Sequence, residues 1–267
     1  MNKEIDGDSG TPVKDLPPLT IGDQDDREYW NQPRVLASTG KNWKVDKGGI
    51  LEWFQKSCEK HGVPKDAKVL VIGGGPGRLV KGMQQLLQPL TKDWHITVAE
   101  GSAGMVENAK KNLAEIHPDC PDSNNLCKVD YLHKNAMDLE YKEQFDVIWT
   151  CTVLQHNSTK NKDIFVPKMY NALKPQGLYI CLEGTKTERM WVDPTPEYPE
   201  GQFKKYNERG RFTFDWSDSK GAKGTAAWFI NYIGKHGFEI QEYGSHHIDW
   251  FVFRKIREVG ENGAEES

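Results

Sequence analysis

The sequence predicts an α/β fold, a doubly wound and mostly parallel seven-stranded sheet that ends in an antiparallel hairpin. Short apolar runs alternate with segments of helical periodicity between residues 68 and 183, and the first run leads directly into a cluster of glycines. A pair of strand-like runs after residue 237, separated by turn residues, predicts the hairpin. With 267 residues, the chain is long enough for one large domain of this class.

The elements of the first half begin with a helix over residues 50–61, where apolar residues recur at helical spacing until Gly62 and Pro64 interrupt the pattern. Residues 69–72 are four apolar residues in succession, typical of a strand buried on both faces. Helical periodicity returns over residues 78–89. The remaining elements are a strand over 95–99, a helix over 103–113 and a short strand over 130–133.

In the second half of the chain, strands and helices continue to alternate, and the chain then ends in two successive strands. Strands are expected over residues 145–149 and 178–182, with a helix over 164–173 between them. Thr225 is placed to cap a further helix that Gly237 terminates. The last two strands, over 238–243 and 248–253, form the hairpin.

Composition divides the chain into one folded domain and two tails. We expect residues 1–25 to be a disordered acidic tail, because they are rich in Asp, Gly and Pro and poor in large apolar side chains. Residues 257–267 predict a second disordered tail. The single domain over 26–256 would contain an N-terminal helical cap (26–64) and a substrate-pocket insert (184–224).

The composition also excludes several classes of protein. Charged residues make up 28% of the chain, and no apolar stretch approaches the roughly 20 residues that cross a bilayer. Without an apolar leader segment, we expect a cytoplasmic protein that does not bind membranes. The five cysteines are scattered, which argues against a metal site. The chain has no run of Lys and Arg, so we expect no nucleic-acid partner.

A glycine-rich turn and an acidic residue predict a nucleoside site. Gly73, Gly75 and Gly77 follow the first predicted strand and precede a helix, where backbone N–H groups face a ligand. Glu100 closes the second predicted strand, and a carboxylate there can accept both hydroxyls of a ribose. Arg78 stands where the dinucleotide fingerprint needs a third glycine, so NAD is disfavoured. No Gly-Lys-Ser/Thr follows, so a P-loop is excluded as well.

This turn resembles motif I of class I S-adenosylmethionine-dependent methyltransferases, and the resemblance extends over residues 66–183. It implies that S-adenosylmethionine is the cofactor, with the glycines bordering its methionine end and Glu100 binding its ribose. Val71 departs from the family's usual acid in this motif, and Gly101 replaces its usual apolar residue. Further cofactor contacts implied by the resemblance are Arg78, Gly101, Ser102, Met105, Asn135, Ala136, Met137 and Thr150.

The reacting centre is expected at the ends of the fourth and fifth predicted strands. Methyl transfer mainly requires placement of donor and acceptor, and an amine or hydroxyl acceptor must also lose a proton. His156 and Glu183 follow these strands and would form a base and an acceptor-orienting pair. Side chains predicted to bind the acceptor are Tyr29 and Trp30 from the N-terminal cap and Trp191 and Tyr206 from the insert.

We therefore expect a methyltransferase that acts on an amine or hydroxyl of a small molecule, and two alternatives stay open. Tyr29-Trp30-x-Gln32 and Gly77-Arg78-Leu79 resemble segments of protein N-terminal α-amine methyltransferases, so a peptide is a possible acceptor. The other alternative is a non-catalytic protein that keeps the fold as a cofactor-binding or interaction surface. Turnover with a panel of metabolites and peptides separates the three.

Overall fold

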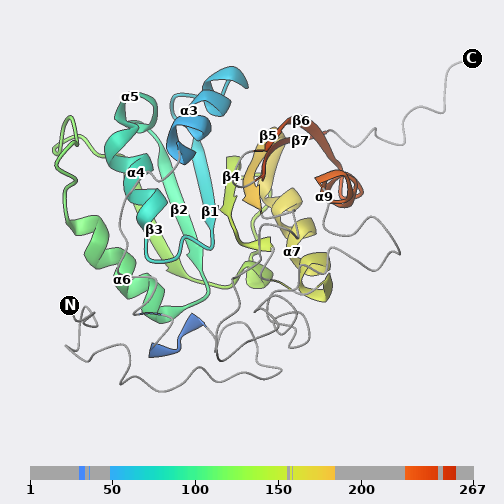
Figure 1. The fold of residues 1–267 in the computed structure, drawn as a ribbon, viewed down its shortest axis with the longest axis horizontal. Coiled ribbons are helices and arrows are strands. Elements are labelled where there is room, and N and C mark those ends of the chain that lie inside the picture. The colour runs from blue at the N-terminus through green and yellow to red at the C-terminus, as the bar shows by residue number, and fades with distance from the viewer. Residues whose placement is uncertain are drawn as a thin grey trace, which may run out of the picture. The chain divides into compact units, whose positions relative to one another are not determined.

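The structure is a computed structural model that describes residues 30–33, 36, 49–154, 157, 159–183, 226–245 and 249–256. The chain falls into two compact units, divided between Asp138 and Leu139, and their elements are drawn in Figure 1. The predicted insert 184–224 and both predicted tails lie outside the described residues.

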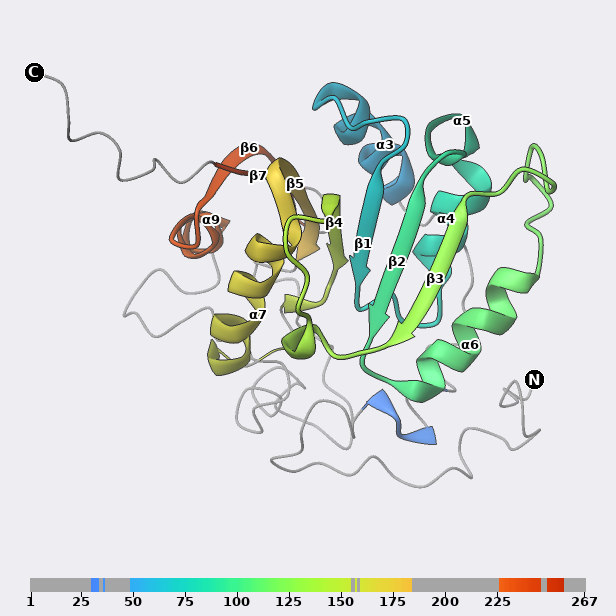
Figure 2. The same cartoon turned by 180° about the vertical axis from the view of Figure 1, so that it is seen from behind.

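The first unit is a three-stranded parallel sheet in which β2 lies between β1 and β3. Helices α4 and α6 lie on one face of these strands, as the two opposite views in Figures 1 and 2 show. The strands alternate with helices, as the sequence predicts. The elements are α3 (Ile50–Lys60), β1 (Lys68–Ile72), α4 (Arg78–Leu86), α5 (Gln88–Thr91), β2 (His95–Glu100), α6 (Ala103–Ala114), β3 (Lys128–His133) and the 3-10 helix η2 (Ala136–Asp138).

Burial explains why these segments form their elements. Four residues of β1 are buried, which suits a strand covered on both faces. Phe54 and Cys58 of α3 are one helical turn apart and both buried, and Phe54 meets the ring of Trp94 edge to face. In α6, Met105, Val106 and Ala109 lie on one face of the helix and are all buried.

The predicted helix over residues 78–89 is in fact two helices. Helix α4 ends at Leu86, and α5 starts at Gln88 with Pro89 in its first turn. Proline has no N–H, so within a continuous helix it would lose a backbone hydrogen bond and clash with the preceding turn. In the first turn of a new helix that N–H has no partner in any case, which explains the break.

The second unit combines a parallel strand pair with an antiparallel hairpin. β4 pairs with β5 in parallel, β7 pairs antiparallel with β5, and β6 pairs antiparallel with β7. Helix α7 contacts β5, and α9 contacts β6. The elements are β4 (Phe145–Cys151), α7 (Thr159–Ala172), β5 (Leu173–Glu183), α9 (Ala226–Gly234), β6 (Phe238–Ser245) and β7 (Asp249–Lys255).

Strand β5 begins earlier than the sequence predicts. Leu173 and Leu178 both pair with β4, opposite Phe145 and Val147, so four residues of β5 bulge out between them. These are the Lys-Pro-Gln-Gly residues expected to be a turn before the strand. The turn was predicted at the right residues, but it lies inside β5, because β5 pairs with β4 both before and after it.

The predicted fold class is confirmed. The seven strands comprise the predicted parallel pairs and the predicted C-terminal antiparallel hairpin. None of the helices in the described part of the chain could span a lipid bilayer.

Candidate cofactor site

The glycine-rich turn connects β1 to α4 through three residues with positive φ. The φ angles are 66° at Gly73, 54° at Gly75 and 90° at Gly77. Side chains other than glycine rarely adopt this region. The Gly73 N–H donates to the Ala99 carbonyl (2.9 Å), and the Gly77 N–H donates to the Gly74 carbonyl (3.1 Å). The turn is therefore tied both to itself and to β2.

Two of these glycines differ in the space around them. A Cβ at Gly77 would lie 3.0 Å from the Tyr131 hydroxyl and 3.3 Å from the Ala109 backbone, whereas a Cβ at Gly75 would meet nothing within 4 Å. We expect Gly77→Ala to lower the free energy of unfolding by about 2–4 kcal/mol, from backbone strain and overpacking together. Gly75→Ala should cost only the strain, about 1–2 kcal/mol. Urea unfolding of both variants measures the difference, and equal losses would contradict this account of the turn.

Glu100 joins the turn to the start of α6. Its Oε2 accepts the Gly75 N–H (2.8 Å), and its Oε1 accepts the Ser102 N–H (2.9 Å). The side chain is 8% exposed. A carboxylate oxygen has two lone pairs, so each of these oxygens can accept one more hydrogen bond. By this count, the carboxylate keeps the capacity to accept a hydrogen bond from a ligand hydroxyl.

The buried position of Glu100 changes its acidity. Burial raises the pKa of Glu100 above its ordinary value of 4.5, while the hydrogen bonds from the Ser102, Gly75 and Gly101 backbone and the nearby His133 act in the opposite direction. The net effect is a raised pKa, so the acid protonates at a higher pH than an exposed glutamate.

This shift predicts a pH dependence of ligand binding. Hydroxyl groups donate to the ionised carboxylate, and protonation removes an acceptor, so affinity for S-adenosylhomocysteine should fall as the pH drops through the raised pKa of Glu100. The loss should set in above the ordinary glutamate pKa. Calorimetric titrations over a pH series measure it, with Glu100→Ala as the control that should show no such step. A wild-type profile that stays flat down to the ordinary glutamate range would contradict the prediction.

Ser102 connects helix α6 to the N-terminal segment. Its hydroxyl caps α6 by accepting the Met105 N–H (3.2 Å). The same hydroxyl lies 3.1 Å from the Trp30 carbonyl and 2.9 Å from Asn31 Oδ1. Asn31 Oδ1 also accepts the Gly104 N–H (3.4 Å). Trp30 and Asn31 are thus held at the start of α6, where the capping residue Ser102 is two residues after Glu100.

The predicted cofactor contacts Asn135, Ala136 and Met137 follow β3, next to the end of β2 that carries the same acid. Asn135 Oδ1 accepts the Met137 N–H (2.9 Å) at the start of η2, and a Cβ at Gly101 would lie 3.2 Å from Asn135 Nδ2. His133 pairs in register with Glu100, and its Nε2 lies 3.1 Å from the Gly101 carbonyl oxygen. The ends of β2 and β3 therefore bring Gly101 and Asn135 together.

A second polar cluster lies in the other unit, at the ends of β4 and β5. Glu183 is fully buried, and its Oε1 accepts from the Val153 N–H (3.2 Å), the Leu154 N–H (3.1 Å) and the Thr150 hydroxyl (3.3 Å). Thr150 is also 2.9 Å from the Tyr179 hydroxyl. Burial raises the pKa of Tyr179, so this hydroxyl stays protonated. The Glu183 carboxylate fixes the chain that follows β4.

The chain at this point is strained. Thr152 has a φ of 56°, which a β-branched residue rarely adopts. Its N–H donates to the Leu182 carbonyl (2.7 Å), and its hydroxyl donates to the Cys151 carbonyl (2.7 Å). Strain of this kind persists only where surrounding contacts impose it, and it is frequent at functional sites.

In the first unit, the predicted cofactor residues lie after β1, β2 and β3 and at the starts of α4 and α6. Arg78 is the first residue of α4, directly after Gly77, and Met105 is buried within α6. Thr150 lies with Glu183, as described above. Four predicted residues lie outside the part of the chain that the structure describes: Tyr29, His156, Trp191 and Tyr206.

Sequence reasoning missed several residues that contact this site. His133 could have been found, because it ends β3 as Glu100 ends β2. The contact of Asn31 could not have been predicted, because no sequence pattern links a single asparagine to Ser102, which lies 71 residues later. Tyr131 was also missed. Within the described residues its buried hydroxyl has no hydrogen-bond partner, and burial together with the charge of Glu100 raises its pKa.

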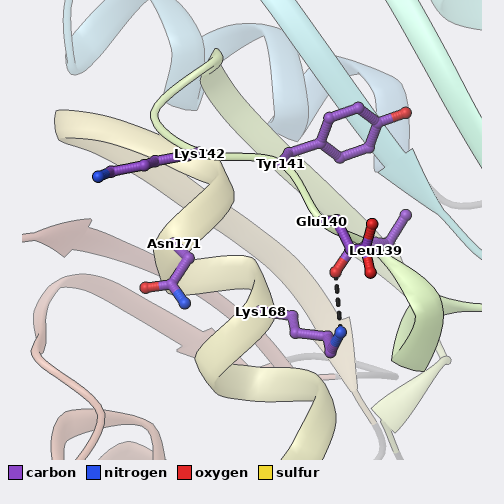
Figure 3. Close-up of a pocket in the computed structure, with 6 residues that line it drawn as sticks. All are labelled: Leu139, Glu140, Tyr141, Lys142, Lys168 and Asn171. Carbon is purple, nitrogen blue, oxygen red and sulfur yellow. Dashed lines mark hydrogen bonds between the residues drawn. The ribbon is translucent and has the colours of Figure 1, made fainter.

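A separate hollow of about 520 Å³ lies in the second unit and involves none of these residues. Figure 3 shows its lining. Lys168 points across it and donates from Nζ to the Leu139 carbonyl (3.0 Å), so this lysine ties α7 to the preceding chain. The lining residues are Leu139, Glu140, Tyr141, Lys142, Lys168 and Asn171.

Comparison with known proteins identifies the domain that carries the turn and the acid. Residues 69–177 match the family model of a methyltransferase domain. A ubiquinone/menaquinone biosynthesis C-methyltransferase from Saccharophagus degradans is 28% identical over 156 residues, which are 58% of this chain and 58% of that protein. The chain thus spans less than two thirds of the length of this relative.

Solved structures share the fold. A SAM-dependent methyltransferase from Methanosarcina mazei has a TM-score of 0.54 at 16% identity, covering 75% of this chain and 97% of that one. Magnesium protoporphyrin IX methyltransferase from Synechocystis, solved with bound SAH, has a TM-score of 0.54 at 15% identity, covering 86% and 97%. Residues 69–177 are thus a methyltransferase domain, and the chain shares the fold of S-adenosylmethionine-dependent methyltransferases of known structure.

Proposed function

We propose that this chain is an enzyme that transfers the methyl group of S-adenosylmethionine to an amine or hydroxyl of a small molecule. The observation that carries the cofactor half of the proposal is Glu100, whose two oxygens hold the glycine turn and the start of α6 and can each accept another hydrogen bond. The open space at Gly75 fits a ligand that approaches the backbone closely.

The proposed roles of the residues follow from this placement. When bound, S-adenosylmethionine supplies a methyl group on a positively charged sulfur. Glu100 binds the two ribose hydroxyls, and the glycine turn lets the methionine end lie against the backbone. The Asn135 side chain and the Ala136 backbone amide bind the adenine, and Met137 is a further cofactor contact, as the family resemblance implies. These contacts fix the donor, and placement is the main requirement of this reaction.

We propose different roles for His156 and Glu183 at the acceptor: His156 accepts the proton, and Glu183 positions the chain before it. An amine or hydroxyl loses a proton as it is methylated, and an imidazole is suited to accept it near neutral pH. The Glu183 carboxylate is already occupied by two backbone N–H groups and a hydroxyl. We therefore assign Glu183 the positioning of Val153 and Leu154, which come shortly before His156 in the chain.

The choice of acceptor is open to direct test. Trp30 is proposed to line the acceptor pocket together with Tyr29, Trp191 and Tyr206. The named relative from Saccharophagus is a C-methyltransferase, so carbon acceptors belong in the same panel as amines, hydroxyls and peptides. Incubation with methyl-labelled cofactor and this panel should label a small amine or hydroxyl compound. Label only on a peptide or on carbon would overturn that part of the proposal.

The cofactor itself can be identified without any acceptor. Native mass spectrometry of the purified protein should detect a bound mass equal to S-adenosylmethionine or its demethylated product, released on denaturation. A retained dinucleotide would contradict the proposal.

A further inference from the structure

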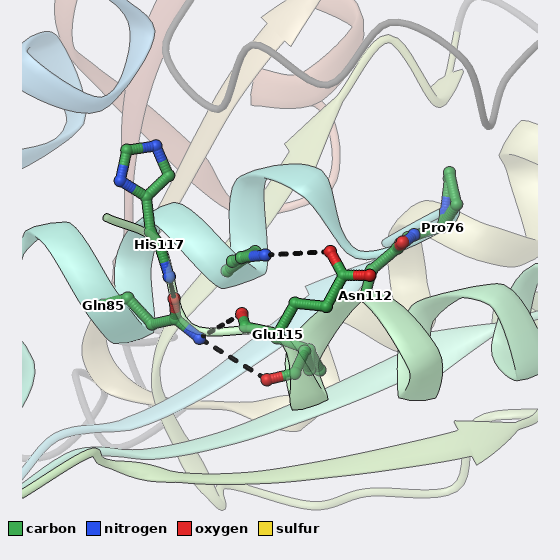
Figure 4. A network of polar contacts seen from close by, with 7 residues as sticks. Pro76, Gln85, Asn112, Glu115 and His117 are labelled. Carbon is green, nitrogen blue, oxygen red and sulfur yellow. Dashed lines mark hydrogen bonds and ion pairs between the residues drawn. The ribbon is translucent and has the colours of Figure 1, made fainter. Parts of the chain in front are cut away.

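We propose that Asn112, near the end of α6, is a positioning residue that holds the glycine turn in its cofactor-binding shape. Its Nδ2 donates a hydrogen bond to the Pro76 carbonyl at 2.9 Å, and Figure 4 shows these two residues side by side. Pro76 is the residue between Gly75 and Gly77. This inference rests on the proposed function, because it concerns the same cofactor site.

The turn needs such an anchor because of its composition. Glycines lose more conformational freedom on folding than any other residue, and three of the five residues in the turn are glycines at positive φ. Glu100 holds the turn at the Gly75 N–H from β2. Asn112 holds it one residue later from α6. Two elements thus fix consecutive residues of the turn from outside.

Asn112 can do this because the end of α6 is itself fixed. Gln85 of α4 is fully buried, and its Nε2 lies within hydrogen-bond distance of the Leu113 carbonyl (3.4 Å) and the Glu115 carbonyl (3.3 Å). Its Oε1 accepts the His117 N–H (2.7 Å). Figure 4 shows Gln85 beside Glu115 and His117. The glycine turn leads into α4, and Gln85 of α4 holds the end of α6. Asn112 then connects the end of α6 back to the turn. The turn, α4 and α6 are thus linked to one another in a ring.

The proposed consequence is a change in affinity. Without the Asn112 donor, the turn samples more conformations, and the cofactor must select the binding-competent fraction. The net worth of one such hydrogen bond corresponds to a two- to tenfold weaker affinity, as an order of magnitude. The measurement is the Kd for S-adenosylhomocysteine, determined by calorimetry for the wild type, Asn112→Ala and Asn112→Asp. The Asp variant keeps the volume of the side chain and loses the donor.

Gln84→Ala is the matched control. Gln84 is half-buried like Asn112, and its Nε2 donates to the Cys127 carbonyl at 2.8 Å, but it does not contact the turn. Both Ala variants should lower the free energy of unfolding by similar amounts. Only the Asn112 variants should weaken binding two- to tenfold and speed hydrogen exchange at the Gly75 and Gly77 amides in the free protein.

The outcomes are distinguishable. If Asn112→Asp and Gln84→Ala bind S-adenosylhomocysteine equally well, Asn112 has a structural role only and the inference is wrong. Equal exchange rates at the two glycine amides in the wild type and in Asn112→Asp would also overturn it. If the wild type itself does not bind S-adenosylhomocysteine, the proposed function fails, and the wild-type titration shows this before any variant is compared.

Discussion

Replacing Glu100 by alanine should weaken the binding of S-adenosylhomocysteine by about 1.5–3 kcal/mol, or roughly tenfold to a hundredfold. The physical reason is that the carboxylate would accept charge-assisted hydrogen bonds from two ribose hydroxyls, which are stronger than bonds between neutral groups. The substitution also frees the Gly75 N–H, so the turn loses one of its two hydrogen bonds to β2 and keeps only the bond from the Gly73 N–H to the Ala99 carbonyl. Calorimetry on the free protein measures the effect.

A matched variant shows whether the site or the whole fold is affected. Glu115 carries a largely exposed carboxylate, 3.8 Å from Lys81 Nζ. Glu115→Ala therefore removes an acid from the same unit without touching the turn. We expect it to bind S-adenosylhomocysteine like the wild type, because the Glu115 side chain is 77% exposed and has no hydrogen bond to the turn in the described residues. Unchanged affinity in Glu100→Ala would remove this acid from the site.

Replacing His156 by alanine should lower turnover by about 10²–10⁴-fold while leaving cofactor affinity nearly unchanged. The expected size is that of a general base that accepts the proton of an amine or hydroxyl acceptor. Single-turnover rates with labelled cofactor, together with calorimetric affinity for S-adenosylhomocysteine, separate the two effects. Wild-type turnover in His156→Ala would show that this histidine takes no part in proton transfer.

Glu183→Gln is the companion variant. The amide oxygen of glutamine can still accept the Val153 and Leu154 N–H groups that the carboxylate now accepts. If Glu183 only positions this segment, turnover in Glu183→Gln should stay within about tenfold of the wild type. A loss as large as that of His156→Ala would instead assign proton chemistry to Glu183.

The fold was predictable because the signal that specifies it is local. The run at 69–72 is apolar throughout, and the run at 145–149 is apolar except for Asp146. A helical pattern follows each run, so the strands of a parallel sheet could be identified one by one. The break at Leu87 was missed because the apolar pattern continues across it. Pro89 alone indicates the boundary between α4 and α5, because proline is unfavourable in the interior of a helix.

The candidate site was predictable to a lesser extent. Gly75 and Glu100 could be linked because the length of a βαβ unit sets their spacing. The contacts of Asn31 with Ser102 and of Asn112 with Pro76 depend on which elements lie side by side. No spacing in one sequence encodes such contacts. The contact of the Glu183 carboxylate with the chain after β4 could not be predicted either, because it also depends on which strands lie side by side.

The most direct test of the account is a crystal structure of the protein with S-adenosylhomocysteine. The account predicts that both ribose hydroxyls lie within hydrogen-bond distance of the Glu100 carboxylate, with the homocysteine end against the turn at Gly75. An adenosyl group bound elsewhere on the chain, with Glu100 contacting only the protein, would contradict it.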